Sequence, residues 1–146
     1  MPKERKKLNY RELVQQLTWE IRHEIQQKVA NLDNRLDVER EGFKAFFDYV
    51  CQNKNLYRII REAESVDLEL FIEHYRKIAE GYIKGLKVAM NEGQIRTIEP
   101  ETVAYCLMGM AEFLGMRWVL WENKLPPKKE VDAMMDFVFY GIAPKR

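Results

Sequence analysis

Histidine and carboxylate side chains that could do acid–base or metal chemistry lie far apart in this sequence. His23 and His74 fall on different expected helices, and neither has a cysteine or carboxylate at the spacing of a metal ligand. The sequence contains no glycine-rich phosphate loop, no Gly-x-Ser-x-Gly motif and no paired-carboxylate motif. We therefore expect a protein that is not an enzyme, with no catalytic residue, no metal site and no cofactor.

Two of these residues leave an alternative open. Glu112 has apolar neighbours in the sequence, so it is either a carboxylate hydrogen-bonded at an interface or a catalytic acid. His74 lies at the margin of the apolar side of its expected helix, either as a hydrogen-bonded residue at the edge of the core or as a ligand-binding residue. Loss of turnover on Glu112→Gln would favour a small α-helical enzyme.

Charge and cysteine content argue against several classes of protein. The net charge of +1 gives no overall attraction to nucleic acid or to a membrane. Cys51 and Cys106 fall within helical patterns without framework spacing, as expected for reduced core residues of an intracellular protein. The basic start, Met1–Leu8, is not followed by the apolar region of a signal peptide. We expect a cytoplasmic protein with a disordered lead-in over residues 1–8 and one domain over residues 9–146.

The longest apolar run must supply the main structural helix, and it spans Glu101–Glu122. At 100° per residue it has two apolar faces, and a helix that is apolar all round is buried on all sides. One face can pack on the chain itself, while the other needs a second subunit or lipid. The run is long enough to span a bilayer, but Glu112 and Arg117 near its middle oppose insertion. We favour a buried dimerisation helix.

Hydrophobic periodicity predicts five further helices and no strands, so the expected fold is an all-α six-helix bundle. Apart from the apolar run, the expected helices span Tyr10–Asn31, Asp37 to about Asn53–Asn55, Leu56–Glu64, Leu68–Glu92 and Lys128–Gly141.

Residues typical of helix ends support these boundaries. Asp37 and Asp67 are expected N-caps, Gly93 ends a helix, and Pro100 suits a first helical position. Gly81 and Gly85 lie inside a helix, where they either permit close approach of another helix or a ligand, or are simply tolerated.

Aromatic and aliphatic residues on several helices could line a cavity. A mostly apolar pocket with a few polar groups is typical of sites for small lipophilic ligands, and tyrosine hydroxyls can orient a polar group. The alternative is that these rings fill the core. We predict a pocket between the first, second, fourth and fifth helices, lined by Leu17, Ile21, Phe43, Phe47, Tyr75, Ile78, Tyr82 and Met108.

Three successive segments resemble the C-terminal domain of the tetracycline-repressor (TetR/AcrR) family of transcriptional regulators. They are LYRIIREAESVDLELF (Leu56–Phe71), HYRKIAEGYIKGLKVAMNEGQIR (His74–Arg96) and PETVAYCLMGMAEFLGMRWVLWE (Pro100–Glu122). A weaker match, NYRELVQQLTWEIR (Asn9–Arg22), is similar to the helix that opens that domain. Each motif is weakly specific by itself, and the resemblance depends on their order and spacing.

The resemblance implies an all-α domain that binds a small hydrophobic effector and forms a homodimer. In the family, the last two long helices pair with those of a second subunit in a four-helix bundle. Small and apolar residues of these two helices are the expected interface: Ala104, Ala111, Gly115, Trp118, Met134, Met135 and Val138.

The resemblance also implies that DNA contacts come from an N-terminal helix-turn-helix domain, which we do not find in this sequence. We therefore expect no sequence-specific DNA binding by this chain alone. The exposed Trp19 is a candidate contact with that missing domain. The alternative to a regulator's effector domain is a stand-alone small-molecule-binding dimer, or a dominant-negative partner of an intact regulator.

Overall fold

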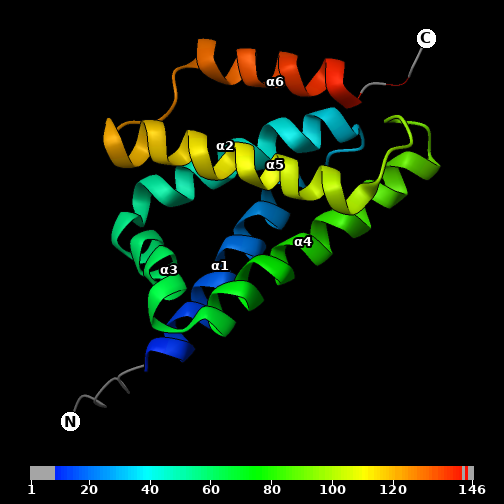
Figure 1. Cartoon of the computed structure of the whole chain (residues 1–146). Helices are drawn as coiled ribbons and strands as arrows, with labels where there is room; N and C mark the ends of the chain where they lie inside the picture. The colour runs from blue at the N-terminus through cyan, green and yellow to red at the C-terminus, as the bar shows by residue number, and fades with distance from the viewer. Residues whose placement is uncertain (1–8, 143, 145–146) are drawn as a thin grey trace.

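The computed structural model describes residues 9–142 and 144, and within them it contains six α-helices and no β-strand (Figure 1). The all-α class and the six helices predicted from the sequence are therefore confirmed, whereas the predicted lead-in, residues 1–8, lies outside the described residues. The helices are α1 (Tyr10–Val29), α2 (Arg35–Gln52), α3 (Lys54–Val66), α4 (Leu68–Asn91), α5 (Pro100–Gly115), the π-helix η1 (Met116–Trp121) and α6 (Lys128–Ile142).

Most of these helices begin with a residue whose side chain caps the first turn. One of these N-caps differs from the predicted residue. The Asp67 carboxylate accepts a hydrogen bond from the Leu70 backbone N–H at the start of α4, as predicted, and Pro100 is the first residue of α5. Gly93 has a φ of +73° after α4, a conformation that glycine adopts without strain. The prediction of Asp37 as the N-cap of α2 is wrong, because the helix begins earlier and Asn34 caps it.

The buried apolar residues form two clusters. The larger cluster is built from α2, the second half of α4, α5, η1 and α6, and includes Phe47, Leu86 and Val119. The smaller cluster joins α1, α3 and the start of α4 to Tyr49 of α2. In Figure 1, α6 lies across the end of the molecule formed by α2 and α5, while α1 and α4 run side by side below them. Both clusters thus contribute to the region where α1, α2, α4 and α5 meet.

Two small residues of α5 that we assigned to the dimer interface, Ala104 and Gly115, are buried within this chain. Ala104 is fully buried, and a Cβ atom at Gly115 would lie 3.3 Å from Cε1 of Phe46 on α2. The absence of a side chain at Gly115 therefore lets Phe46 of this chain's own α2 approach α5. The α6 residues assigned to the interface, Met134, Met135 and Val138, are likewise buried in the larger cluster. Ala111 and Trp118 are half-buried, and Ala111 lines a cavity described below.

The exposed sides of α5, η1 and α6 carry aromatic side chains instead. Phe113 and Trp121 are 69% and 68% exposed, and Phe137 and Tyr140 on α6 are 74% and 75% exposed. The predicted continuous helix also changes from α to π geometry at Met116. Cys106 lies on the exposed side of α5 and is not the core residue that we expected.

One helix, Pro100–Trp121, is long and apolar enough to cross a membrane by length and composition. Core helices of soluble proteins pass the same test, so this property is weak evidence for a membrane span. Only 33% of the residues in its most apolar window are buried inside the chain. The helix therefore has apolar surface that its own chain leaves uncovered.

Candidate ligand-binding site

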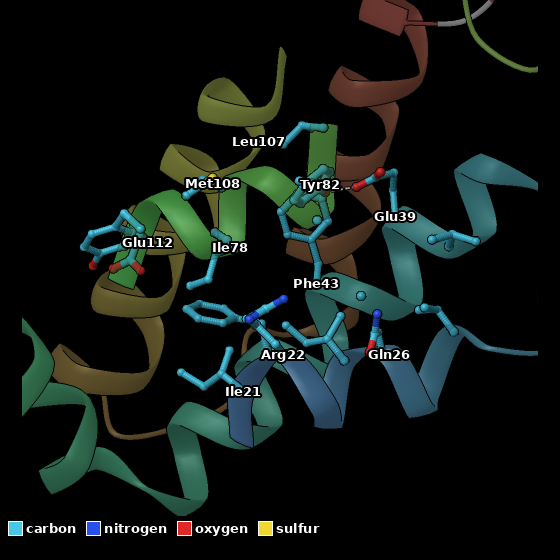
Figure 2. Close-up of a pocket in the computed structure, with 18 of the residues that line it drawn as sticks. Ile21, Arg22, Gln26, Glu39, Phe43, Ile78, Tyr82, Leu107, Met108 and Glu112 are labelled. Atoms are coloured by element: carbon cyan, nitrogen blue, oxygen red, sulfur yellow. Dashed lines mark hydrogen bonds between the residues drawn. The ribbon is translucent and has the colours of Figure 1, made fainter. Parts of the chain in front are cut away.

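A cavity of about 300 Å³ lies between α1, α2, α4 and α5. This volume is at the lower end of the range for small-molecule sites. Apolar side chains from all four helices form most of its wall, and Figure 2 shows them converging on the space. The principal apolar lining residues are Ile21, Ile25, Val29, Val38, Phe43, Phe46, Ile78, Leu107, Met108 and Ala111.

Arg35, Glu39 and Tyr82 form a polar cluster at one end of the cavity, in which Glu39 is buried and the other two are half-buried. The Arg35 Nε donates to Glu39 Oε1 at 2.8 Å, its Nη2 lies 2.7 Å from the same oxygen, and the Tyr82 hydroxyl donates to Oε2. The Arg35 guanidinium also lies 5.5 Å from the centre of the Tyr82 ring. Burial raises the pKa of the Glu39 carboxyl, and Arg35 and Tyr82 partly oppose this effect. The cluster is internally paired and adds little net charge to the cavity.

Gly85 and Gly81 of α4 have different surroundings. A Cβ atom at Gly85 would lie 2.5 Å from Nη1 of Arg35, so this glycine makes room for the guanidinium. A Cβ atom at Gly81 would have no atom within 4 Å, and Gly81 belongs to the cavity wall. The close approach predicted for these glycines is therefore observed at Gly85, where the Arg35 side chain approaches the helix backbone. At Gly81 no neighbouring atom comes this close.

Glu112 lies on the opposite side of the cavity from Glu39 (Figure 2). Its Oε2 accepts a hydrogen bond from the Tyr57 hydroxyl and lies 3.8 Å from Nη1 of Arg61. Burial raises the pKa of the Glu112 carboxyl, and the hydroxyls of Tyr57 and Tyr75, with Arg61, act in the other direction. Glu112 is thus hydrogen-bonded within its own chain, at a position that a bound molecule can reach.

The third polar part of the cavity wall is exposed. Arg22 and Gln26 of α1 border the cavity, and both side chains are exposed to solvent. A wider groove along α4 lies beside the cavity and is lined by the same two residues together with Arg35, Val38 and Gly81. We interpret this side, between α1 and α4, as the entrance.

The cavity brings together most of the side chains predicted to bind a ligand. Six of the eight line it: Ile21, Phe43, Tyr75, Ile78, Tyr82 and Met108. Leu17 and Phe47 do not, and their assignment to the pocket is corrected, because Leu17 packs in the smaller cluster and Phe47 in the larger one.

Sequence reasoning missed Glu39, Arg35 and the entrance residues. Glu39 is almost fully buried, although its position in the sequence is surrounded by charged residues. The spacing of Arg35 and Glu39, four apart on a helix, is the local signal for their ion pair. Their burial depends on Tyr82, which is distant in sequence, so no local pattern indicates it.

His74 is buried and hydrogen-bonded outside the cavity wall. Its Nδ1 lies 2.6 Å from Oγ1 of Thr18, and burial lowers the pKa of the imidazole to about 4. Within residues 9–142 and 144, no group of three His, Cys, Asp or Glu side chains is arranged to hold a metal ion. The cavity offers hydrogen-bonding groups, two carboxylates and apolar surface, which suit reversible binding.

A comparison of the chain with models of known protein families finds no family that matches, and a search among curated proteins finds no match either.

Proposed function

We propose that this chain is the effector-binding and dimerisation domain of a cytoplasmic transcriptional regulator of the tetracycline-repressor family, and that its cavity binds a small lipophilic molecule. The observation that carries the proposal is the cavity between α1, α2, α4 and α5, with apolar walls and polar groups at two ends. The assignment to the family rests on the order and spacing of the sequence motifs that resemble its C-terminal domain. No step of bond making or breaking is part of this function.

The position of α1 suggests how binding could be transmitted. Ile21, Arg22 and Ile25 of α1 form one wall of the cavity, and residues of α4 form another. A ligand that contacts both helices favours the arrangement of α1 and α4 that fits it best, and so shifts the population between arrangements. In an intact regulator, such a shift changes the spacing of two DNA-reading domains, which must sit about one helical turn apart on DNA.

Gly81 gives a direct test of the cavity. Gly81 is exposed where the cavity meets the groove along α4, and a Cβ atom there would have no atom within 4 Å, so the leucine of Gly81→Leu should cover the entrance side of the cavity without a clash. Replacing a glycine inside a helix also stabilises the helix by about 1 kcal/mol. We expect Gly81→Leu to unfold at a higher temperature than the wild type and to lose the binding of lipophilic compounds found by a thermal-shift screen.

Two further variants control for this substitution. Gly81→Ala gains the same helix propensity and leaves most of the cavity open, so it should be stabilised and still bind. Arg76→Leu adds a leucine at an exposed position of the same helix and should bind as the wild type does. Isothermal titration calorimetry measures all four proteins. Equal affinity of the wild type and Gly81→Leu for the hits would show that they bind elsewhere.

A further inference from the structure

The two carboxylates of the cavity differ in how fully their charge is paired. Glu39 receives Arg35 on one oxygen, at 2.7 and 2.8 Å, and Tyr82 on the other. The groups facing Glu112 are the hydroxyls of Tyr57 and Tyr75 and the guanidinium of Arg61. The hydroxyls are neutral. The Arg61 guanidinium lies at 3.8 Å, and its side chain is half-exposed, so solvent screens its attraction. The positive charge beside Glu112 is therefore more distant and more exposed than the one beside Glu39.

Two aromatic residues meet this carboxylate through their hydroxyls, Tyr57 and Tyr75. Phe46 and Tyr75 line the cavity, and Tyr57 packs edge-on against Phe46 with ring centroids 6.1 Å apart. A carboxylate beside several rings is a favourable environment for an ammonium group, because the faces of aromatic rings attract cations. An anionic group would be repelled by Glu112, and of the two arginines that line the cavity Arg35 is paired with Glu39 and Arg22 is exposed at the entrance.

We propose that the ligand of this cavity is a lipophilic organic cation, a protonated amine that donates to Glu112 and whose apolar body packs against Phe43, Ile78 and Met108. This inference rests on the proposed function of the cavity as a binding site, and it adds the chemical class of the ligand. The raised pKa of Glu112 fits it, because a bound ammonium group supplies the compensating charge that burial makes favourable.

The test compares three probes with the same eight-carbon chain: octylamine, which is protonated at pH 7, octanol and octanoate. Isothermal titration calorimetry should show octylamine binding to the wild type about tenfold more tightly than octanol, because a charge-assisted hydrogen bond is stronger than a neutral one. Octanoate should bind most weakly. In Glu112→Gln the preference for octylamine should disappear, while the affinity for octanol changes little.

A second test uses Arg61. If Glu112 had only a structural role, replacing Arg61 would not change the affinity for octylamine selectively. Since Arg61 competes with the ligand for Glu112, Arg61→Gln should bind octylamine several-fold more tightly and octanol as before. Arg58 is exposed on the same helix, so Arg58→Gln is the matched control and should change neither affinity. Glu101→Gln, at an exposed position of α5, controls in the same way for the loss of an acid.

The outcomes separate this inference from the proposal on which it rests. Octanol or octanoate binding as tightly as octylamine, with Glu112→Gln unchanged, would overturn the cationic ligand and leave the cavity as a binding site. Failure of all three probes and of every lipophilic compound in the screen would overturn both.

Discussion

His74 is the buried residue whose protonation state the structure defines most fully. The Thr18 hydroxyl donates to the Val14 carbonyl at 2.8 Å, and with its proton used there Oγ1 accepts from the His74 tautomer that is protonated on Nδ1, 2.6 Å away. Burial lowers the pKa of the imidazole from 6.5 to about 4, so the ring is neutral near pH 7 in the folded protein. The unfolded chain binds a proton at His74 more readily than the folded chain does.

This difference predicts a loss of stability in acid. Because the folded pKa is lower than the unfolded one, the contribution of His74 is complete above pH 6.5 and is lost as the pH falls to about 4. At 1.36 kcal/mol per pKa unit, the loss amounts to about 3 kcal/mol. We expect His74→Leu to be less stable than the wild type at pH 7, by about 1 kcal/mol for the lost hydrogen bond, and more stable at pH 4.

Urea unfolding of both proteins between pH 4 and pH 7 measures this change of order. His23→Gln, which alters an exposed histidine of α1, is the control and should follow the wild type. Parallel curves for the wild type and His74→Leu would mean that His74 is not buried as a neutral group.

At the residue scale, the sequence indicates which residue types line the cavity better than it indicates their pairing. Tyr82 was predicted in the lining because it lies on an apolar stripe, which is a local property. The burial of Glu39 beneath Tyr82 depends on how α2 packs against α4, and 43 residues separate the two. A carboxylate surrounded by charged residues in the sequence is normally exposed, so only the packed structure identifies Glu39.

At the scale of the element, the start of α2 is defined by Asn34. Its side-chain oxygen accepts hydrogen bonds from the backbone N–H groups of Leu36 at 2.9 Å and Asp37 at 3.4 Å. Asp37 itself lies in the first turn, where its charge interacts favourably with the helix dipole. Both residue types are typical of helix starts, so the sequence alone does not distinguish which of them is the cap.

The two positions should differ in their contribution to stability. Removing an N-cap side chain costs about 1 kcal/mol, whereas an exposed acid in the first turn contributes about 0.3–1 kcal/mol at low salt and less at high salt. We expect Asn34→Ala to lower the free energy of unfolding more than Asp37→Ala does, with the difference increasing in 0.5 M salt. Chemical denaturation measures both variants, and a larger loss of stability for Asp37→Ala would show that Asp37 is the more important residue at this helix start.

The orientation of α5 could not be predicted from hydrophobic periodicity. Its two faces have similar apolar character, so periodicity predicts a helix without predicting which face turns inward. The face that turns inward carries Ala104 and Gly115, and the missing side chain at Gly115 allows the close contact with Phe46 of α2. Asp67 and Pro100, in contrast, act on a backbone only a few residues away, and their roles were predicted correctly.

At the scale of the whole molecule, the helical class follows from periodicity, whereas the surface available to a partner depends on the packing. The residues first assigned to the dimer interface are mostly used by the chain's own core. The apolar surface that remains is on the exposed sides of α5, η1 and α6, where Phe113, Trp121, Phe137 and Tyr140 are located. We propose that this surface, and not the small residues of α5, contacts the second subunit of the homodimer.

The exposed position of these aromatic residues makes the dimer testable without disturbing the fold. A glutamate at Gly115 would disrupt the contact with Phe46 inside the protomer. Loss of the dimer in that variant could then result from unfolding. A glutamate at Phe113 or Phe137 replaces a side chain that is exposed in the protomer, and so leaves the core intact. If a second subunit covers the position, each variant buries an unpaired charge, and burying an unpaired charge is strongly unfavourable. If nothing covers it, the charge stays in solvent.

We therefore expect the wild type to sediment as a dimer at micromolar concentration, with an interface of about 1,600 Å² or more in total. Phe113→Glu and Phe137→Glu should sediment as monomers, with the helical circular dichroism of the wild type. Val88→Glu, which places the same charge at an exposed apolar position of α4, should remain a dimer. A monomeric wild type would contradict the homodimer, and dimeric glutamate variants would show that the second subunit binds to another face.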